Sequence, residues 1–245
     1  MAKTREYQPR TYRHWTKGRE LVSYGVIVKE TDLYIRTATN LKSKAERLVL
    51  KYRAPLEKYI EQHPDFLSSL EPISIAKDSP KIVKAMAAAT AQVGVGPMAA
   101  VAGAIAEFVG EELLAYSPEV IIENGGDIYI KSLKKRTIGI YAGNSPLTGK
   151  IGLEIEAKET PVGVCTSSGT VGHSLSFGKA DAATVIARSA TLADAAATAL
   201  GNIVKKPEDI TKAIAFARNI DDIKGVVIII GDRMGIWGRV KICPM

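Results

Sequence analysis

Two hydrophobic periods follow one another along the first part of the chain. Every second residue from 22 to 28 is valine or tyrosine, which is typical of a half-buried strand, and a second strand is expected after a turn near residues 30–32. Residues 40–64 instead carry apolar side chains at helical spacing, and Pro55 is expected to break or restart that helix. The pattern therefore predicts a hairpin followed by an amphipathic helix.

Two helices rich in alanine and glycine are predicted next. The first has Ser79 as its expected N-cap and Pro80 at its first helical position, and it ends at Gly94. The second covers residues 97–114 and is again opened by a proline. Side chains this small allow a helix to approach a neighbouring backbone closely, so we expect both helices to lie in a tightly packed interior.

The second half of the chain is dominated by apolar runs of strand length. One pair of runs flanks the sequence Asn-Gly-Gly-Asp at residues 124–127, and Asn-Gly is a strong hairpin signal. Further strands are expected at residues 136–143, 150–157, 162–168 and 182–188, helices around Asp194 and at 207–219, and a terminal hairpin at 225–242.

This order of strands, helices, strands, helices and strands favours an α+β fold in which Ala/Gly-rich helices pack on antiparallel sheet. The chain has 245 residues, of which 46% are hydrophobic. It contains no linker rich in Pro, Ser or Gly and no repeat of fixed period. We therefore expect a single domain, residues 1–245, with residues 1–19 as a basic N-terminal arm.

The net charge of +7 permits an anionic partner without identifying one. Arg5, Arg10, Arg13, Lys17 and Arg19 are among the basic residues of the segment 1–19, with Tyr7, Tyr12 and Trp15 between them. Such a combination can bind nucleic acid. No recognised nucleic-acid motif follows. The favoured interpretation is a solvated arm, and nucleic acid is not the expected partner.

Two cysteines, Cys165 and Cys243, lie far apart and outside any CxxC motif, which argues against a zinc site. The polar start of the chain lacks the apolar segment of a signal peptide. The most apolar run, residues 93–106, is shorter than the roughly 20 residues needed to span a bilayer. We expect a cytoplasmic protein that has no membrane partner and keeps its thiols reduced.

Two polar, glycine-rich segments are candidates for ligand binding. One is "ENGGD", residues 123–127, and the other is "TSSGTVGHS", residues 166–174, which contains His173. Glycine lets the backbone approach a ligand, and N–H groups with hydroxyls suit phosphate oxygens. The alternative is that both are turns. The second segment is not GxSxG, so a serine hydrolase is not indicated.

Asp194 and Thr198 are four residues apart on a predicted helix, so they share one face. Two interpretations fit this spacing. Asp194 could cap its own helix from the first turn, where a carboxylate suits the helix dipole. Alternatively, the carboxylate and the hydroxyl could hold Mg²⁺, which keeps waters and substrate phosphates as its other ligands. Spacing alone does not choose between them.

Taken together, "ENGGDI", "TSSG" and "ADAAATA" resemble, in this order, the motifs of the ApbE superfamily, the FAD:protein FMN transferases. That resemblance covers mainly residues 96–202. A second resemblance, to a family of short cytosolic ApbE-like proteins of uncharacterised activity, extends over almost the whole chain.

The resemblance implies a metal site and a nucleotide site. Asp194 and Thr198 match the pair that binds Mg²⁺, which in turn holds the diphosphate of FAD. The segment "GAIAEF", residues 103–108, resembles one that gives the metal a backbone carbonyl, assigned here to Ala104. The implied nucleotide-binding residues are Asn124, Gly125, Gly126, Asp127, Thr166, Ser167, Ser168, Gly169 and His173. In the transferases the acceptor is a threonine of a partner protein, and AMP leaves.

The sequence departs from the family pattern at one residue and in one segment. Glu107 stands where the transferases have lysine, and the segment after His173 differs. Three hypotheses therefore stay open. The first is an Mg²⁺-dependent transferase or pyrophosphatase-like enzyme acting on a nucleotide diphosphate such as FAD. The second is a non-catalytic nucleotide-binding or structural protein, and the third a nucleic-acid-binding protein. The substrate, the acceptor and any homo-oligomer are not determined by the sequence.

Overall fold

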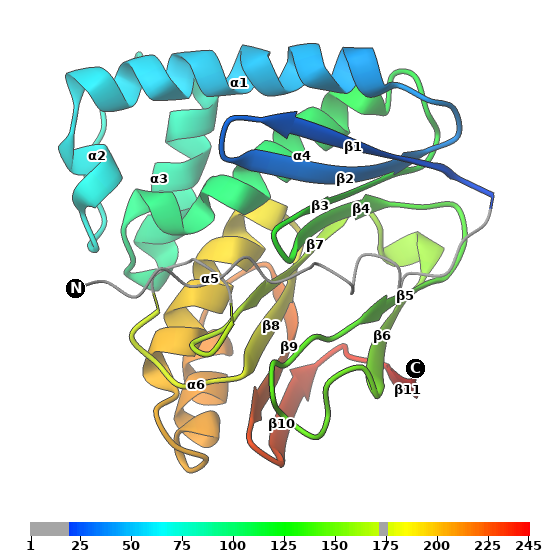
Figure 1. The fold of residues 1–245 in the computed structure, drawn as a ribbon. Helices are drawn as coiled ribbons and strands as arrows, with labels where there is room; N and C mark the ends of the chain where they lie inside the picture. Colours follow the sequence, from blue (N-terminus) through cyan, green and yellow to red (C-terminus); the bar gives the residue numbers. More distant parts are fainter. Residues whose placement is uncertain (1–19, 172–175) are drawn as a thin grey trace.

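An eight-stranded antiparallel sheet forms the centre of the computed structural model, which describes residues 20–171 and 176–245 (Figure 1). Its strand order is β1-β2-β3-β4-β7-β8-β9-β10. The strands are β1 (Val22–Val28), β2 (Thr31–Thr37), β3 (Val120–Asn124), β4 (Asp127–Lys131), β7 (Val162–Ser167), β8 (Ala182–Ala187), β9 (Ile223–Ile230) and β10 (Arg233–Gly238). Strands from both halves of the chain are therefore hydrogen-bonded into one sheet.

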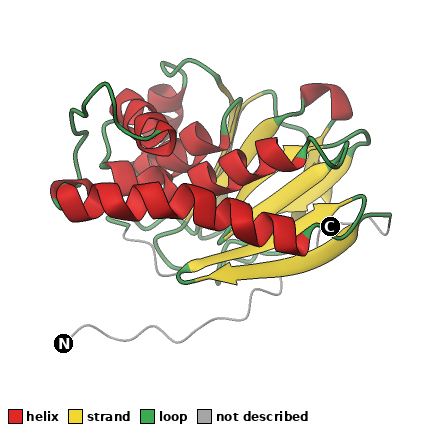
Figure 2. Ribbon diagram, turned by 90° about the horizontal axis from the view of Figure 1, so that it is seen from above, coloured by secondary structure: helices red, strands yellow, loops and turns green. Residues whose placement is uncertain are grey.

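The α-helices and one 3₁₀ turn lie on one face of this sheet (Figure 2). They are α1 (Lys42–Gln62), α2 (Asp65–Ser68), α3 (Lys81–Val93), the 3₁₀ turn η2 (Pro97–Ala100), α4 (Val101–Leu113), α5 (Ala190–Ile203) and α6 (Asp209–Ala217). The larger hydrophobic core fills the space between helices and sheet and includes Leu33, Met86, Ile105, Leu200 and Ile228. The expected α+β architecture, with Ala/Gly-rich helices on antiparallel sheet, is confirmed.

The opposite face of the main sheet is covered by a small three-stranded sheet of order β11-β6-β5. Its strands are β5 (Arg136–Gly139), β6 (Ile151–Ile155) and β11 (Ile242–Pro244), and the 3₁₀ turn η3 (Ala157–Glu159) follows β6. Leu153 of the small sheet packs in a second core with Val164 and Val227 of the main sheet. Because strand side chains alternate between faces, Val164 faces this core while Cys165 faces the helices.

Two local expectations were wrong. Pro55 lies inside α1 without ending it, since Val49 and Leu56 on either side of the proline are buried in the same core. Ser79 does not cap α3, because the helix begins at Lys81 with Pro80 in the capping position. The Ser79 hydroxyl is buried and has no hydrogen-bond partner among the described residues.

Small residues bring α4 and α5 together, as the composition predicted. A Cβ atom on Gly103 would lie 2.3 Å from the carbonyl oxygen of Ala190 and 2.8 Å from the Cβ of Asp194. A Cβ on Gly163 would lie 2.3 Å from the Cα of Ala190, so α5 also contacts the backbone of β7.

Across the described ranges, no single helix is long and apolar enough to cross a membrane. The pair formed by residues 81–93 and 97–113 passes the same test by length and composition, with a bend of 103° between its halves.

Candidate functional site

The "ENGGD" hairpin places an amide and a carboxylate side by side on the helical face of the main sheet. Asn124 ends β3 and Asp127 begins β4, and the two are cross-strand partners. The Asn124 side-chain amide donates a 3.1 Å hydrogen bond to the carbonyl oxygen of Ala102, in the first turn of α4. Both side chains are buried. The hairpin is therefore attached directly to the N-terminal end of α4.

Gly125 and Gly126 make the turn between these strands, with φ values of 68° and 110°. Backbone in this left-handed region favours glycine, which explains the Gly-Gly sequence. The Gly126 N–H donates a 2.9 Å hydrogen bond to the Glu123 carboxylate.

Asp194 lies in the second turn of α5 and caps a different helix. Its Oδ2 accepts a 2.8 Å hydrogen bond from the N–H of Gly103, and the N–H of Ala102 also bonds to this carboxylate. These N–H groups belong to the first turn of α4, where no intrahelical acceptor exists. The N-cap of α5 is Ser189, and its first turn holds no acidic residue. The alternative that Asp194 caps its own helix is therefore wrong.

Asp127 and Asp194 form a buried pair of like charges. Burial raises the pKa of Asp194 to about 7, against the lowering effect of the Gly103 and Ala102 N–H groups. Burial also raises the pKa of Asp127 well above its usual range, and the Asp194 charge raises it further. Hydrogen bonds from Cys165 and from the backbone of Thr166 oppose that rise in the Asp127 pKa. Two carboxylates in one low-dielectric site favour binding of a proton or a cation.

One carboxylate oxygen in the pair formed by Asp127 and Asp194 is not used by the hydrogen bonds of the described residues. Asp127 Oδ1 is buried and has no hydrogen-bond partner among the described residues. Thr198 follows Asp194 by one turn on the same helix face and is half-buried. Ala104 is fully buried in the first turn of α4, next to Gly103. The available donors are oxygens, the ligand type that Mg²⁺ prefers.

No cluster of three or more His, Cys, Asp or Glu side chains suited to a metal occurs within residues 20–171 and 176–245. Two carboxylates and a hydroxyl nevertheless fit Mg²⁺, because this ion is commonly held by one or two carboxylates and completes its shell with water and phosphate oxygens. Zinc and other metals that need a full set of protein ligands fit this site less well.

The "TSSG" segment is divided by strand geometry. The Thr166 hydroxyl bonds to that of Thr184 at 2.9 Å, on the sheet face away from the helices. Ser167 faces α5 instead, and a Cβ on Gly201 would lie 3.3 Å from its hydroxyl oxygen. Of these side chains only Ser167 faces the helical layer that holds Asp194, although the Thr166 backbone contacts Asp127.

Residues 168–171, the rest of this segment that the structure describes, form a loop held by hydrogen bonds within the loop and to Ala180. The Ser168 hydroxyl accepts hydrogen bonds from the N–H groups of Thr170 and Val171, at 3.1 and 3.0 Å. The Gly169 N–H donates to the carbonyl oxygen of Ala180 at 2.8 Å. His173 lies outside the described residues, so its predicted role stays a prediction.

The structure gives Glu107 a role that the sequence does not indicate. Its Oε2 accepts hydrogen bonds from the Ser189 hydroxyl at 2.7 Å and from the Thr191 N–H and hydroxyl at 2.9 and 2.6 Å. Glu107 of α4 thus caps α5, while Asp194 of α5 caps α4. The spacing along the sequence gives no indication of this exchange, because the partners are more than 80 residues apart.

Cys165 is a second residue whose place in this site the sequence does not indicate. Its thiol donates to the carbonyl oxygen of Ala190 at 3.4 Å and contacts Asp127. Burial raises the pKa of this thiol well above its usual range, and the Asp127 and Asp194 charges add to that effect. The Cys165 thiol is therefore neutral beside the carboxylates of Asp127 and Asp194. Strand alternation from Gly163, which contacts α5, could have placed Cys165 on the same face.

The fold is that of an ApbE-like protein. The chain belongs to the family described as AbpE bacteria, whose model matches residues 13–230. It is 44% identical to the UPF0280 protein MJ1526 of Methanocaldococcus jannaschii over 221 residues, which are 88% of this chain and 90% of the relative. It is 47% identical to the UPF0280 protein of Methanocella arvoryzae over 192 residues, 78% of each chain.

Two solved structures have the same fold. One is the flavin transferase ApbE from Vibrio cholerae, with a TM-score of 0.59, 14% identity and coverage of 89% of this chain and 96% of that one. The other is the ApbE protein from Thermotoga maritima, with a TM-score of 0.57, 14% identity and coverage of 88% and 96%. At this identity the likeness concerns the fold alone.

Proposed function

We propose that this protein binds a nucleotide diphosphate such as FAD through Mg²⁺ and acts in flavin-nucleotide or phosphoryl transfer or hydrolysis. The metal is held by Asp194, Thr198 and the Ala104 carbonyl, as the resemblance implies, and Asp127 is added here as a further ligand. The observation that carries the proposal is the unpartnered Asp127 Oδ1 in a buried pair with Asp194. Two buried carboxylates are costly unless a proton or cation compensates them. A magnesium ion whose other ligands are phosphate oxygens supplies that compensation.

The chain's own residues prepare this site in three ways. The N–H groups of Ala102 and Gly103 hold the Asp194 carboxylate in one orientation. Asn124 holds the hairpin that carries Asp127 against α4. The positive end of the α4 dipole favours an anionic ligand beside it. Bound Mg²⁺ would neutralise phosphate charge and assist transfer to a hydroxyl of an acceptor protein or to water.

A second candidate is a nucleotide-binding protein without transfer activity. It is favoured by Glu107, which stands where the resembled transferases have lysine and whose carboxylate is occupied in capping α5. In this protein that position serves the packing of α4 and α5, so no cation stands there to face an anionic ligand. Binding would persist in this case, while release of AMP from FAD would be absent.

Calorimetric titration of FAD and of ADP, with and without Mg²⁺, tests the proposal. The parent should bind only with Mg²⁺, and Asp127→Asn and Asp194→Asn should each lower affinity at least about tenfold, since each removes a charged ligand. Thr198→Val should have a smaller effect, because it removes a neutral oxygen and keeps the shape. Asp232→Asn, at an exposed turn, is the matched control.

Parent-like, Mg²⁺-dependent binding by Asp194→Asn would show that the metal site is misassigned. Chromatography separates the two candidates once an acceptor protein is added to the FAD mixtures, because transfer to its hydroxyl or hydrolysis by water releases AMP, while simple binding leaves FAD intact.

A further inference from the structure

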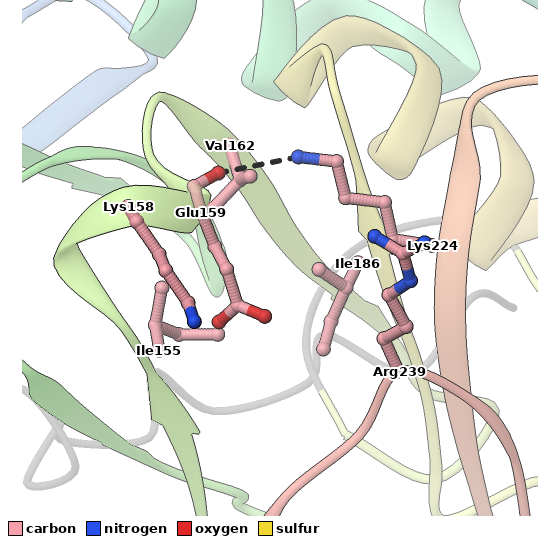
Figure 3. Close-up of a pocket in the computed structure, with 7 residues that line it drawn as sticks. All are labelled: Ile155, Lys158, Glu159, Val162, Ile186, Lys224 and Arg239. Carbon is pink, nitrogen blue, oxygen red and sulfur yellow. Dashed lines mark hydrogen bonds between the residues drawn. The ribbon is translucent and has the colours of Figure 1, made fainter.

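A cavity of about 460 Å³ lies on the face of the main sheet that carries the small sheet, and Figure 3 shows the residues that line it. It is lined by Val162 of β7, Ile186 of β8, Lys224 of β9, Ile155 of β6, Lys158 and Glu159 of η3, and Arg239, which follows β10. Val162 and Ile155 belong to the core between the two sheets. The cavity is therefore separate from the site of Asp127 and Asp194, although both use β7.

The lining combines an apolar floor with a charged rim. Ile155, Val162 and Ile186 are buried and supply the floor. In Figure 3 Lys224 and Arg239 stand on one side of Ile186, and Lys158 and Glu159 stand on the other. Three cationic side chains thus surround the opening against one carboxylate, which leaves the rim positive.

These cations lack close ion pairs among the described residues. Among the described residues, Lys158, Lys224 and Arg239 form no ion pair with a carboxylate within the 4 Å range. The Lys224 amine donates to the carbonyl oxygen of Glu159 at 3.2 Å. The Glu159 carboxylate accepts a 3.0 Å hydrogen bond from the N–H of Glu156 in the capping box of η3. That bond orients the carboxylate toward the backbone of η3.

The surroundings of Lys224 contain charges of both signs. Burial lowers the pKa of its amine and the Glu159 charge raises it, while the positive charges of Arg188 and Arg239 lower it and Asp222 raises it. An anion between Lys224 and Arg239 would relieve this repulsion between like charges.

We propose that this cavity binds a small organic anion, a carboxylate or a phosphate monoester, that carries an apolar body. The anionic group lies between Lys224 and Arg239, and the apolar body covers Ile155, Val162 and Ile186. A bare inorganic anion would leave most of the cavity of about 460 Å³ unfilled, and a neutral apolar molecule would leave the cations without a counter-charge. Such sites combine a mostly apolar lining with a few polar groups that fix orientation.

Calorimetric titration with hexyl phosphate and with hexanoate tests this proposal and distinguishes the two head groups. The titrations contain EDTA, which keeps the predicted magnesium site from contributing. At least one probe should bind the parent. Hexanol has the apolar body without the charge, and inorganic phosphate has the charge without the apolar body, so each should bind at least about tenfold more weakly.

Two variants and two controls make the test specific. Lys224→Met keeps the length of the side chain and removes its charge, and Arg239→Gln changes an exposed side chain, so both should fold. Each should weaken the bound probe about tenfold or more. Lys212→Met, on the exposed surface of α6, removes one charge elsewhere and should bind like the parent. Asp194→Asn should also bind like the parent, which separates this cavity from the proposed nucleotide site.

The proposal would be overturned by no binding of either probe at millimolar concentration, by equal binding of hexanol, or by parent-like affinity in both Lys224→Met and Arg239→Gln. Inorganic phosphate that binds as tightly as hexyl phosphate would equally contradict it, because the apolar floor would then play no part.

Discussion

Asp194 Oδ2 accepts a 2.8 Å hydrogen bond from the N–H of Gly103, so a side chain of α5 holds the first turn of α4. The same carboxylate lies beside Asp127, whose second oxygen has no partner among the described residues. One residue thus combines a structural bond with a charge that calls for a cation. These two roles respond differently to substitution, which makes them separable by experiment.

Asp194→Ala should lower the free energy of unfolding by about 1–2 kcal/mol, because the N–H groups of Ala102 and Gly103 lose their acceptor. Asp194→Asn keeps an acceptor oxygen and removes the repulsion with Asp127, so without metal it should be at least as stable as the parent. Urea unfolding in EDTA measures both. An asparagine variant as unstable as the alanine variant would show that the charge, rather than the hydrogen bond, supports α4.

Glu107→Lys should be more destabilising than Glu107→Gln. Lysine removes the acceptor of the bonds from Ser189 and Thr191, while glutamine retains one acceptor oxygen. We expect a loss of roughly 2–4 kcal/mol for lysine and about 1 kcal/mol for glutamine by urea unfolding. Glu61→Lys, exposed near the end of α1, is the matched charge reversal and should change stability by less than about 0.5 kcal/mol. Equal effects of the two lysine variants would argue against the capping role.

Gly103→Ala should prevent the close packing of α4 on α5. The added Cβ would lie 2.3 Å from the Ala190 carbonyl oxygen, which is backbone and cannot rotate away. Overpacking of this kind costs about 1–3 kcal/mol or more. Gly25→Ala is the matched control, because a Cβ there meets only a carbonyl oxygen at 3.9 Å. Thermal melts of both variants compare them, and a Gly103→Ala melting temperature equal to that of the parent would contradict this packing.

Without metal, the protein should lose stability as the pH rises from about 4 toward 7. In the native state Asp194 has a pKa raised to about 7, whereas in the unfolded chain an aspartate ionises near pH 4. The native state therefore binds more protons in this window, and the free energy of unfolding falls with pH. The raised pKa of Asp127 acts in the same direction.

Urea unfolding in EDTA between pH 5 and pH 8 measures this dependence, which we expect to amount to a few kcal/mol. Asp194→Asn should flatten it, and Mg²⁺ with ADP should oppose it. A parent and an asparagine variant with the same pH slope would show that the buried carboxylates do not titrate as described.

The prediction of a single domain is tested by the cooperativity of unfolding. β1 and β10, at opposite ends of the sequence, form the two edges of the same sheet. Partial unfolding would expose the shared core, so residues 20–245 should unfold in one transition, with the same midpoint by circular dichroism and tryptophan fluorescence. Two separate transitions, or two stable proteolytic halves, would contradict it.

The local elements of this fold could be predicted from the sequence because their causes are local. Alternation from 22 to 28, the glycine pair at 125 and 126, and proline at the start of the 97–114 segment each act over a few residues. The i, i+4 spacing of Asp194 and Thr198 belongs to the same class. Pro55 shows the limit, because buried contacts on both sides of it keep α1 continuous.

Only the tertiary structure decided what the candidate site residues touch. The exchange of caps between Asp194 and Glu107 joins helices far apart in the chain, so no local pattern encodes it. Alternation in β7 turns Thr166 away from the helices and Cys165 toward Asp127, although the motif appears continuous in the sequence. Residue types and spacing thus determined the elements and the candidate donors. Packing determined which donors meet, because burial and charge depend on neighbours that only the folded chain brings together.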